Sequence, residues 1–481
     1  MKTDVLGYGI DFGSTNSLIS IAYLDRVEVL SINQYGDFGL NKCMPTFVYF
    51  DRNADYRTGD DAIDEYVITA QALTYCSDCR LDCHNYMKDD HACLNARLAH
   101  GIKMALADTQ YYGTYSWGHK FQLEDMVAWI LMALRKLAAD TLYDVTLPVV
   151  VGVPVEYDGE KEGSREVAIE RMRRGASVAG FQNIEFLEEP IAALIDQAAA
   201  KAQSHIDGVC VAVDFGGGTC DVAVSSSGSS PWAPESTQGV AIGGELFNSL
   251  LFTEIIAPRL GLENVVNRHK WLSNRSSMVM AVGQAGFRNK LSKASDGESQ
   301  LLIKIINRGQ VNNFWHAIKE TKIDLSSKEN SSVEFHKQDI HISEPVSRAD
   351  FERVIARSHD AVAETIKAAL SAAQISHEDV KHVIKTGGSS ALPIFNRMLD
   401  EMFPNAVMEA RPALTTIASG LGEYIRIKDE LNKPVFESND EVDALPGHVK
   451  DLASAERQLE KSSQNSWDDL ATRIKRFFGR S

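Results

Sequence analysis

Two short polar segments of the sequence have the composition of phosphate-binding loops. The first is Asp-Phe-Gly-Ser-Thr-Asn at residues 11–16, and the second is Asp-Phe-Gly-Gly-Gly-Thr at residues 214–219. Glycines let backbone N–H groups approach a phosphate chain closely, and a hydroxyl neighbour suits the same task. The leading Asp11 and Asp214 suit the water shell of Mg2+, which takes few direct carboxylates. A single Asp-Phe-Gly is often an ordinary hairpin turn, whereas two copies in equivalent contexts predict two loops that clamp a nucleotide.

Each polar segment lies between two short apolar runs. The first pair of runs covers residues 5–10 and 18–23, and the second covers residues 208–213 and 220–224. Apolar runs of this length, bounded by turn-forming residues, predict strands joined in a hairpin. The chain therefore contains an internal repeat.

The elements that must position these loops follow from helical spacing, apolar runs and glycine stops. Helices are expected at residues 123–140, 160–179, 245–259, 281–292, 314–326 and 348–373. Further strands are expected at residues 145–155 and 380–386, the second of which opens onto Gly-Gly-Ser-Ser. After about residue 425 the sequence becomes charged and poor in strands, which predicts a boundary there.

Length and composition restrict the class of protein. A chain of 481 residues and 53.0 kDa exceeds the size of a single core, so we expect at least two domains. The net charge of -17 argues against nucleic acid as a specific partner and against an anionic membrane surface. Seven cysteines are too few for a disulfide framework, and neither a signal peptide nor a transmembrane segment is recognisable. These features predict a cytoplasmic protein.

Two other motif interpretations fail on their context. Gly7, Gly9 and Gly13 have the wrong spacing for a dinucleotide fingerprint, and the first two fall inside a strand. Asp-Phe-Gly also occurs in protein kinases, but the chain has no His-Arg-Asp loop and no Val-Ala-Ile-Lys strand. Neither interpretation is kept.

Seven segments stand in the order found in one family. They are residues 11–17, 152–154, 180–193, 214–221, 242–248, 322–327 and 386–393. Over about residues 5–425 the sequence resembles the nucleotide-binding domain of the DnaK-type heat-shock protein 70 family, most closely its truncated YegD-like members. This family lies within the actin, hexokinase and chaperone ATPase superfamily.

The resemblance implies an α/β fold, the two-lobed actin-like ATPase fold. The two lobes would be duplicated copies of a ribonuclease H-like unit. Each would have a mixed five-stranded sheet with helices on both faces. We expect a first lobe at residues 1–205, a second lobe at 206–425 and a charged helical C-terminal tail at 426–481. The tail is too short for the β-sandwich and helical lid of a chaperone, so no peptide-binding domain is expected.

The resemblance also implies which residues meet ATP and Mg2+. Asp11 and Asp214 would order Mg2+ and its waters, and Glu189, before Pro190, would orient the attacking water. Lys103 is the candidate for the family's phosphate-facing lysine. The residues expected to bind the nucleotide are Gly13, Ser14, Thr15, Asn16, Gly216, Gly217, Gly218, Thr219, Gly243, Gly244, Glu245, Lys322, Ser326, Gly387, Gly388 and Ser389. Ser14 and Asp214 are counted with Glu189 and Lys103 as catalytic.

Two of these roles have plainer alternatives. For Glu189 the alternative is a charge that favours the start of a helix, near the positive end of its dipole. Lys103 has a weak surrounding pattern, and its alternative is a solvated helix lysine.

The resemblance implies slow hydrolysis of ATP, with closure of the lobes acting as a switch. A filament-forming ATPase of the actin or MreB kind is the alternative, because it shares Glu-Glu-Pro and the second glycine loop. Lys322 with Leu-Ser-Ser at residues 325–327 favours the chaperone branch. A sugar or acetate kinase is a third class, which a requirement for a small phosphoryl acceptor would reveal.

Cysteine and histidine residues crowd into one short stretch of the first lobe. They are Cys76, Cys79, Cys83, His84, His91 and Cys93. Cys-x-x-Cys followed by Cys or His is a plausible tetrahedral zinc set. The spacing after Cys79 is irregular, so reduced cysteines in an insertion are the alternative.

The C-terminal tail carries apolar residues at helical spacing. Trp467, Leu470, Ile474, Phe477 and Phe478 form the stripe, with a basic far face. Such a helix would bind a protein partner or a membrane surface, or dock on its own domain.

Overall fold

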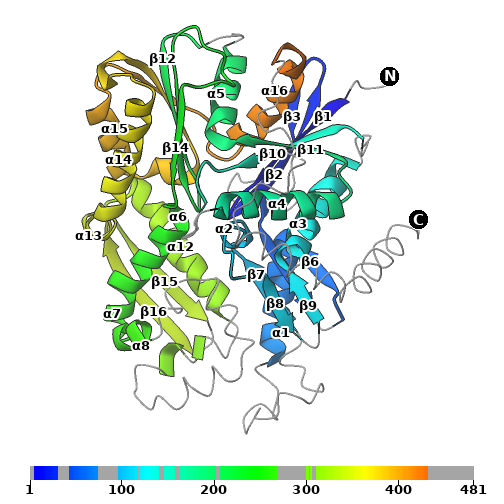
Figure 1. The fold of residues 1–481 in the computed structure, drawn as a ribbon. Helices are drawn as coiled ribbons and strands as arrows, with labels where there is room; N and C mark the ends of the chain where they lie inside the picture. Colours follow the sequence, from blue (N-terminus) through cyan, green and yellow to red (C-terminus); the bar gives the residue numbers. More distant parts are fainter. Residues whose placement is uncertain are drawn as a thin grey trace.

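The computed structural model describes residues 5–30, 43–51, 53–73, 96–116, 119–139, 146–157, 163–201, 206–268, 300–302, 304–305, 310–337 and 339–431. Two mixed sheets dominate this part of the chain (Figure 1).

The first sheet has the strand order β11-β10-β1-β2-β3, and β4 pairs with β2 beside this path. Its strands are β1 (Val5–Phe12), β2 (Asn16–Tyr23), β3 (Val27–Val29), β4 (Met44–Pro45), β10 (Pro148–Val153) and β11 (Asn183–Glu188). Strand β1 runs antiparallel to β2 and parallel to β10, which is parallel to β11. The five residues from Val149 onward in β10 are all buried, as expected for a strand covered on both faces.

The second sheet repeats this topology, with the order β14-β13-β12-β17-β18. Its strands are β12 (Val209–Phe215), β13 (Cys220–Ser225), β14 (Ser236–Val240), β17 (Val380–Thr386) and β18 (Val407–Ala410). Strand β12 runs antiparallel to β13 and parallel to β17, as β1 does to β2 and β10. The internal repeat and the two mixed five-stranded paths predicted from the sequence are confirmed.

Two helices lie between the sheets and pack on each other (Figure 1). Helix α16 (Thr416–Leu431) covers β1, β2 and β10, and helix α5 (Glu189–Ala200) covers β12, β13 and β17. Their approach requires glycine, because a Cβ at Gly420 would lie 1.9 Å from the carbonyl oxygen of Ala192. Val150 of the first sheet and Ala212 of the second belong to one buried cluster around these helices. The two sheets therefore share a core on this side.

Other helices cover the outer faces. The first sheet carries α3 (Leu123–Ala139) and α4 (Ser164–Val178), and the second carries α14 (Ala356–Ala372) and α15 (Pro393–Met402). These helices are amphipathic and bury one face on their sheet.

Smaller units extend from each sheet, at the lower edge of Figure 1. The unit joined to the first sheet contains β5 (Phe47–Asp51), β6 (Tyr56–Thr58), α1 (Gly59–Leu73), β7 (Ala96–His100), α2 (Ile102–Ala105), β8 (Gly113–Ser116) and β9 (His119–Gln122). The unit joined to the second contains α6 (Gly244–Leu250), α7 (Ala257–Arg259), α8 (Glu263–Arg268), α12 (Val311–Ser327), β15 (Asn330–Lys337), β16 (Ile340–Ser347) and α13 (Arg348–Val354).

Several predicted elements change at their ends. The helix expected from residue 160 begins at Ser164, because Gly163 has a φ of 84° that a helix does not continue. The helix expected at 245–259 is α6, a π-helical turn (Leu251–Ile256) and α7 in succession. The helix expected at 348–373 is divided into α13 and α14 at Ile355.

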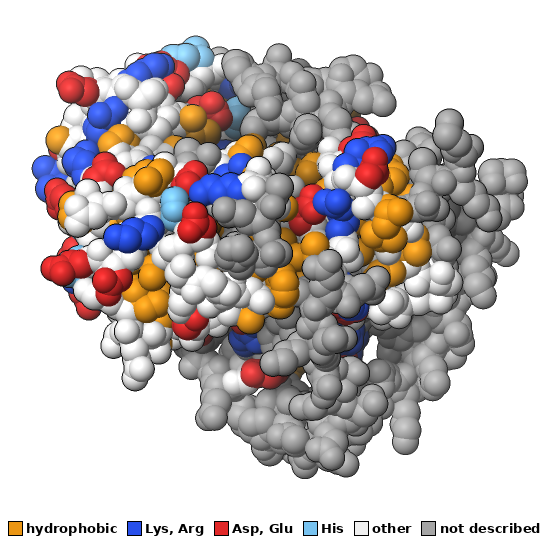
Figure 2. Space-filling view, turned by 90° about the horizontal axis from the view of Figure 1, so that it is seen from above, with side chains coloured by type: hydrophobic (Ala, Val, Ile, Leu, Met, Phe, Trp, Pro, Cys, Tyr) orange, Lys and Arg blue, Asp and Glu red, His pale blue; other side chains and the backbone are white. Residues whose placement is uncertain are grey.

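Three sequence predictions fall outside the described residues. They are the helix at 281–292, the cysteine and histidine cluster at 76–93 and the amphipathic stripe of the tail. The lobe boundaries at 205 and 425 also stay predictions. In the described part of the chain, no helix is long and apolar enough to cross a membrane. Figure 2 shows acidic, basic and apolar side chains interspersed over the described surface of one face.

Candidate active site

The two glycine loops meet tip to tip. The first joins β1 to β2, and the second joins β12 to β13. A Cβ built on Gly217 would lie 2.4 Å from Thr15 Oγ1, and one built on Gly218 would lie 2.6 Å from Ser14 Oγ. Glycine leaves room for these hydroxyls, and the two predicted phosphate loops come together from opposite halves of the chain.

A third segment closes over the second loop. Gly244 N–H donates to Gly216 O at 3.1 Å, and Glu245 N–H donates to Gly217 O at 2.8 Å. A Cβ at Gly243 would lie 2.4 Å from the same Gly217 carbonyl oxygen. The predicted Gly-Gly-Glu segment is therefore part of the site.

One side-chain contact links the first loop to this segment. Thr15 Oγ1 donates to Glu245 Oε1 at 3.5 Å, across 230 residues of sequence. The hydroxyl thus joins the first sheet's loop to the start of α6.

Buried charges lie beneath the loops. Lys103, on α2, forms an ion pair with Glu189 at the start of α5, and both side chains are 6% exposed. Asp214 at the end of β12 is also buried, and Asp11 at the end of β1 is partly buried. The structure brings these four predicted residues into one electrostatic cluster. Lys103 is buried, so it is not the solvated helix lysine of the alternative. Glu189 does begin α5, so its helix-start alternative stays open beside the catalytic role.

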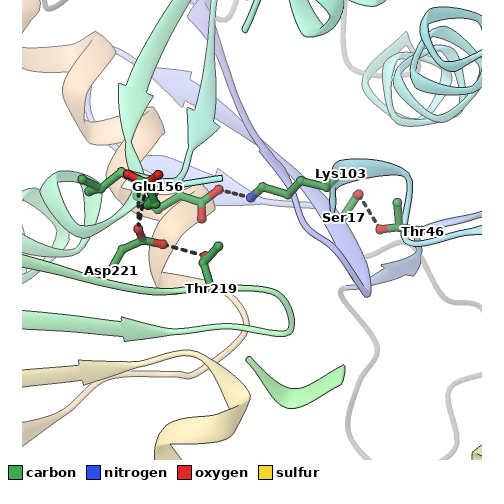
Figure 3. A network of polar contacts seen from close by, with 8 residues as sticks. Ser17, Thr46, Lys103, Glu156, Thr219 and Asp221 are labelled. Carbon is green, nitrogen blue, oxygen red and sulfur yellow. Dashed lines mark hydrogen bonds and ion pairs between the residues drawn. The ribbon is translucent and has the colours of Figure 1, made fainter. Parts of the chain in front are cut away.

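Sequence reasoning missed one carboxylate of this cluster. Asp221 lies on β13 and is 0% exposed. Its carboxylate accepts hydrogen bonds from Thr219 Oγ1 at 2.6 Å and from the backbone N–H groups of Val155 at 2.9 Å and Glu156 at 3.4 Å (Figure 3). The only sequence signal was its position two residues after Thr219.

Burial and crowding shift the pKa of the three aspartates and of the lysine in this cluster. Desolvation, reinforced by the charge of Glu189, raises the pKa of Asp11 to about 7 and that of Asp221 to about 7. The same causes, in the same order, raise the pKa of Asp214 well above its usual value. Burial by itself would lower the pKa of Lys103, but the attraction of Glu189 and Asp11 outweighs it and raises that pKa.

The donor set fits Mg2+. One ammonium faces several carboxylates, so the cluster is short of positive charge, and its oxygens are the ligands that Mg2+ prefers. Within the described ranges, no three His, Cys, Asp or Glu side chains are arranged to hold a metal by themselves. A Mg2+ held largely through waters and phosphates does not need such a group.

The residues predicted for adenosine gather on the far side of the second loop. Lys322 Nζ donates to Gly244 O at 2.9 Å, and Ser389 Oγ donates to Gly216 O at 2.9 Å. Burial lowers the pKa of Lys322 to about 8, although Glu245 partly opposes this. Gly387 has a φ of 79° and lies against Phe215, where a Cβ would come 2.3 Å from the carbonyl oxygen.

Three predicted residues lie at the edges of this arrangement. Asn16 begins β2, and its carbonyl oxygen lies over Gly13. Ser326 is half-buried, one turn beyond Lys322 on α12. Gly388 has open space where a Cβ would stand.

Comparison with known proteins identifies the family. A family model described as "Hsp70 protein" matches residues 7–280 and 289–419, most of the chain. The chain belongs to the Hsp70 family. The resemblance stated from the sequence and the two-lobed actin-like fold are therefore confirmed, and the filament-forming alternative is not favoured.

Three curated relatives illustrate the distance within the Hsp70 family. The chain is 22% identical over 413 residues to a ribosome-associated molecular chaperone of Eremothecium gossypii, covering 83% of this chain and 58% of the relative. It is 24% identical over 410 residues to a chaperone protein HscA homolog of Pseudoalteromonas atlantica, covering 83% and 54%. It is 24% identical over 404 residues to a heat shock cognate HSP70 protein of Trypanosoma brucei brucei, covering 82% and 52%. The chain thus spans about half the length of these Hsp70 relatives.

Proposed function

We propose that this Hsp70-family chain binds ATP with Mg2+ between the two glycine loops and hydrolyses it slowly to ADP and phosphate. The observation that carries the proposal is that the two loops meet and that their leading aspartates interact electrostatically with the buried Lys103–Glu189 pair. Membership of the Hsp70 family supports ATP as the nucleotide. The predicted cytoplasmic location is part of the proposal, whereas clients and a partner for the tail are left to experiment.

The loops would bind the phosphates through backbone N–H groups. Gly217 and Gly218 carry no side chain that would stand between their N–H groups and a phosphate, and Ser14 and Thr15 supply hydroxyls from the opposite loop. Asp11 and Asp214 would hold Mg2+, which when bound would neutralise charge on the phosphates. Lys322, with the segment 387–389, would hold the adenosine end.

Glu189 would orient the attacking water. Its carboxylate is buried and paired with the Lys103 ammonium, which limits its rotation. In the reaction a bond forms between the water oxygen and the γ-phosphorus, the bond to the bridging oxygen of ADP breaks, and the proton of the water leaves with phosphate or solvent. Such a site supplies position and charge rather than covalent chemistry.

Closure of the two lobes would act as the switch. The sheets share a core around α5 and α16 on one side, while on the other the loops touch through Thr15 and Glu245. A ligand that bridges the loops would favour the closed arrangement, because it gains contacts on both sides only there.

Replacing Glu189 by Gln tests the proposal. The amide keeps the size of the side chain and an oxygen for Lys103, but it removes the charge. We expect ATP binding to be largely kept and single-turnover hydrolysis to fall by about 10²-fold or more. Glu185→Gln, on strand β11 away from the loops, is the matched control and should keep the parent rate. Hydrolysis of bound ATP at the parent rate by Glu189→Gln would refute the assignment.

A further inference from the structure

A buried tyrosine hydroxyl, one residue beyond the backbone that binds Asp221, is not used by the proposed function. Tyr157 is 3% exposed, yet no group in the described part of the chain hydrogen-bonds to its hydroxyl. A buried hydroxyl without a partner costs about 1–3 kcal/mol, so native proteins rarely keep one without a reason. Phenylalanine would fill the same space without this cost.

The backbone before Tyr157 is fixed over the site. Val155 and Glu156 donate their N–H groups to Asp221 (Figure 3). Arg165 Nε donates to Val155 O at 3.0 Å. Strand β10 ends at Val153, so this short connection leads from the first sheet directly to the charged cluster. The backbone that leads to Tyr157 is therefore held by Asp221 of the site.

The surroundings of the hydroxyl are those of the reacting groups. Burial raises the pKa of Tyr157, and the charges of Lys103 and Glu189 are the largest electrostatic influences on it. A phenol with a raised pKa stays protonated at neutral pH and can donate a hydrogen bond, but it does not act as a base. The group that the Tyr157 hydroxyl contacts must therefore have an oxygen atom that accepts a hydrogen bond.

We infer that the Tyr157 hydroxyl donates a hydrogen bond to the water that attacks ATP, and so fixes that water together with Glu189. This inference rests on the proposed function. Glu189 accepts a hydrogen bond from the water, and the hydroxyl donates to one lone pair of the water oxygen, which leaves the other for the γ-phosphorus. Tyr157 keeps its proton throughout, so the balance of the hydrolysis is unchanged.

Tyr157→Phe removes only the oxygen atom and is the test. We expect single-turnover hydrolysis to fall by about 10²-fold, the lower end of the scale for a lost hydrogen-bond donor in an active site. ATP affinity should stay within about twofold, because the ground-state phosphates lose no contact. The melting temperature of the nucleotide-free variant should equal or exceed that of the parent, because an unpaired buried hydroxyl is gone. Tyr424→Phe, in the buried side of α16, is the control and should keep the parent rate.

A double variant shows whether the two residues act on one water. If they do, Tyr157→Phe should cost little further rate in a Glu189→Gln background, whereas independent effects would multiply. An unchanged rate, a lowered melting temperature, a parallel loss of ATP affinity or multiplying effects would each overturn the inference. A parent protein that hydrolyses no ATP would instead overturn the proposed function, while the melting temperature would still report on the hydroxyl.

Discussion

Replacing Asp221 by Asn should make the nucleotide-free protein more stable, and increasingly so as the pH rises. Asp221 is fully buried, and desolvation with the charge of Glu189 raises its pKa to about 7 from 3.8. As the pH rises, the Asp221 carboxyl therefore loses its proton at a lower pH in the unfolded chain than in the folded protein. Stability is lost as the pH rises from about 4 to about 7, and the loss is complete above that range.

The size of the effect follows from the two pKa values. They differ by roughly three pH units at 1.36 kcal/mol each, so the ionised carboxyl destabilises the fold by at most about 4 kcal/mol at pH 8. At pH 5 the same linkage gives about 1.5 kcal/mol. An asparagine carries no such cost, and its carbonyl oxygen still accepts from Val155 and Glu156 while its amide faces Thr219. We expect a gain of about 2–4 kcal/mol at pH 8 and a smaller gain at pH 5.

Urea unfolding without nucleotide or Mg2+, followed by tryptophan fluorescence at both pH values, measures this difference. Asp400→Asn is the control, because it removes one negative charge from the exposed end of α15. A variant that is less stable than the parent at pH 8 would refute the reasoning. A gain of equal size at both pH values would do so as well, because it would come from packing and not from ionisation.

Three further predictions concern other parts of the chain. Lys322→Met should weaken ATP binding about tenfold at pH 7. Burial lowers the pKa of Lys322 to about 8, so the parent loses the ammonium between pH 7 and 9 and its ATP affinity should decline toward that of the variant. Nucleotide titrations at pH 7 and pH 9 check this, and parallel pH profiles of the two proteins would contradict it. Two guanidinium nitrogens of Arg411 lie 2.8 and 2.5 Å from the buried Asp196 carboxylate of α5. Arg411→Ala leaves that carboxylate buried without its partner, so the free energy of unfolding should fall by about 2 kcal/mol in a denaturation experiment. Adding Asp196→Asn to the same variant removes the unpaired charge and should restore stability. Removing residues 464–481 should leave ATP turnover nearly unchanged, because every residue assigned to the reaction precedes them; lost turnover without lost stability would show that the tail reaches the site.

The sequence by itself determined the repeated hairpins and the chemistry of their tips. Strands such as β17, expected at residues 380–386 and found at Val380–Thr386, were predictable because apolar runs and turn formers are local signals. The two glycine loops were predictable because the same Asp-Phe-Gly pattern occurs twice between equivalent strands, which an ordinary hairpin turn does not require. Boundaries such as the break at Ile355 were not, because they depend on packing against neighbouring elements.

Only the tertiary structure decided which charges act together. Lys103 and Glu189 are 86 residues apart, and nothing in their local patterns distinguished a buried pair from two solvated side chains. Asp221 and Tyr157 gave even weaker signals, because an acidic residue in a strand and a tyrosine after one are common. Their significance arises from burial, which raises the cost of an unpaired charge or hydroxyl and depends on every segment that covers the site.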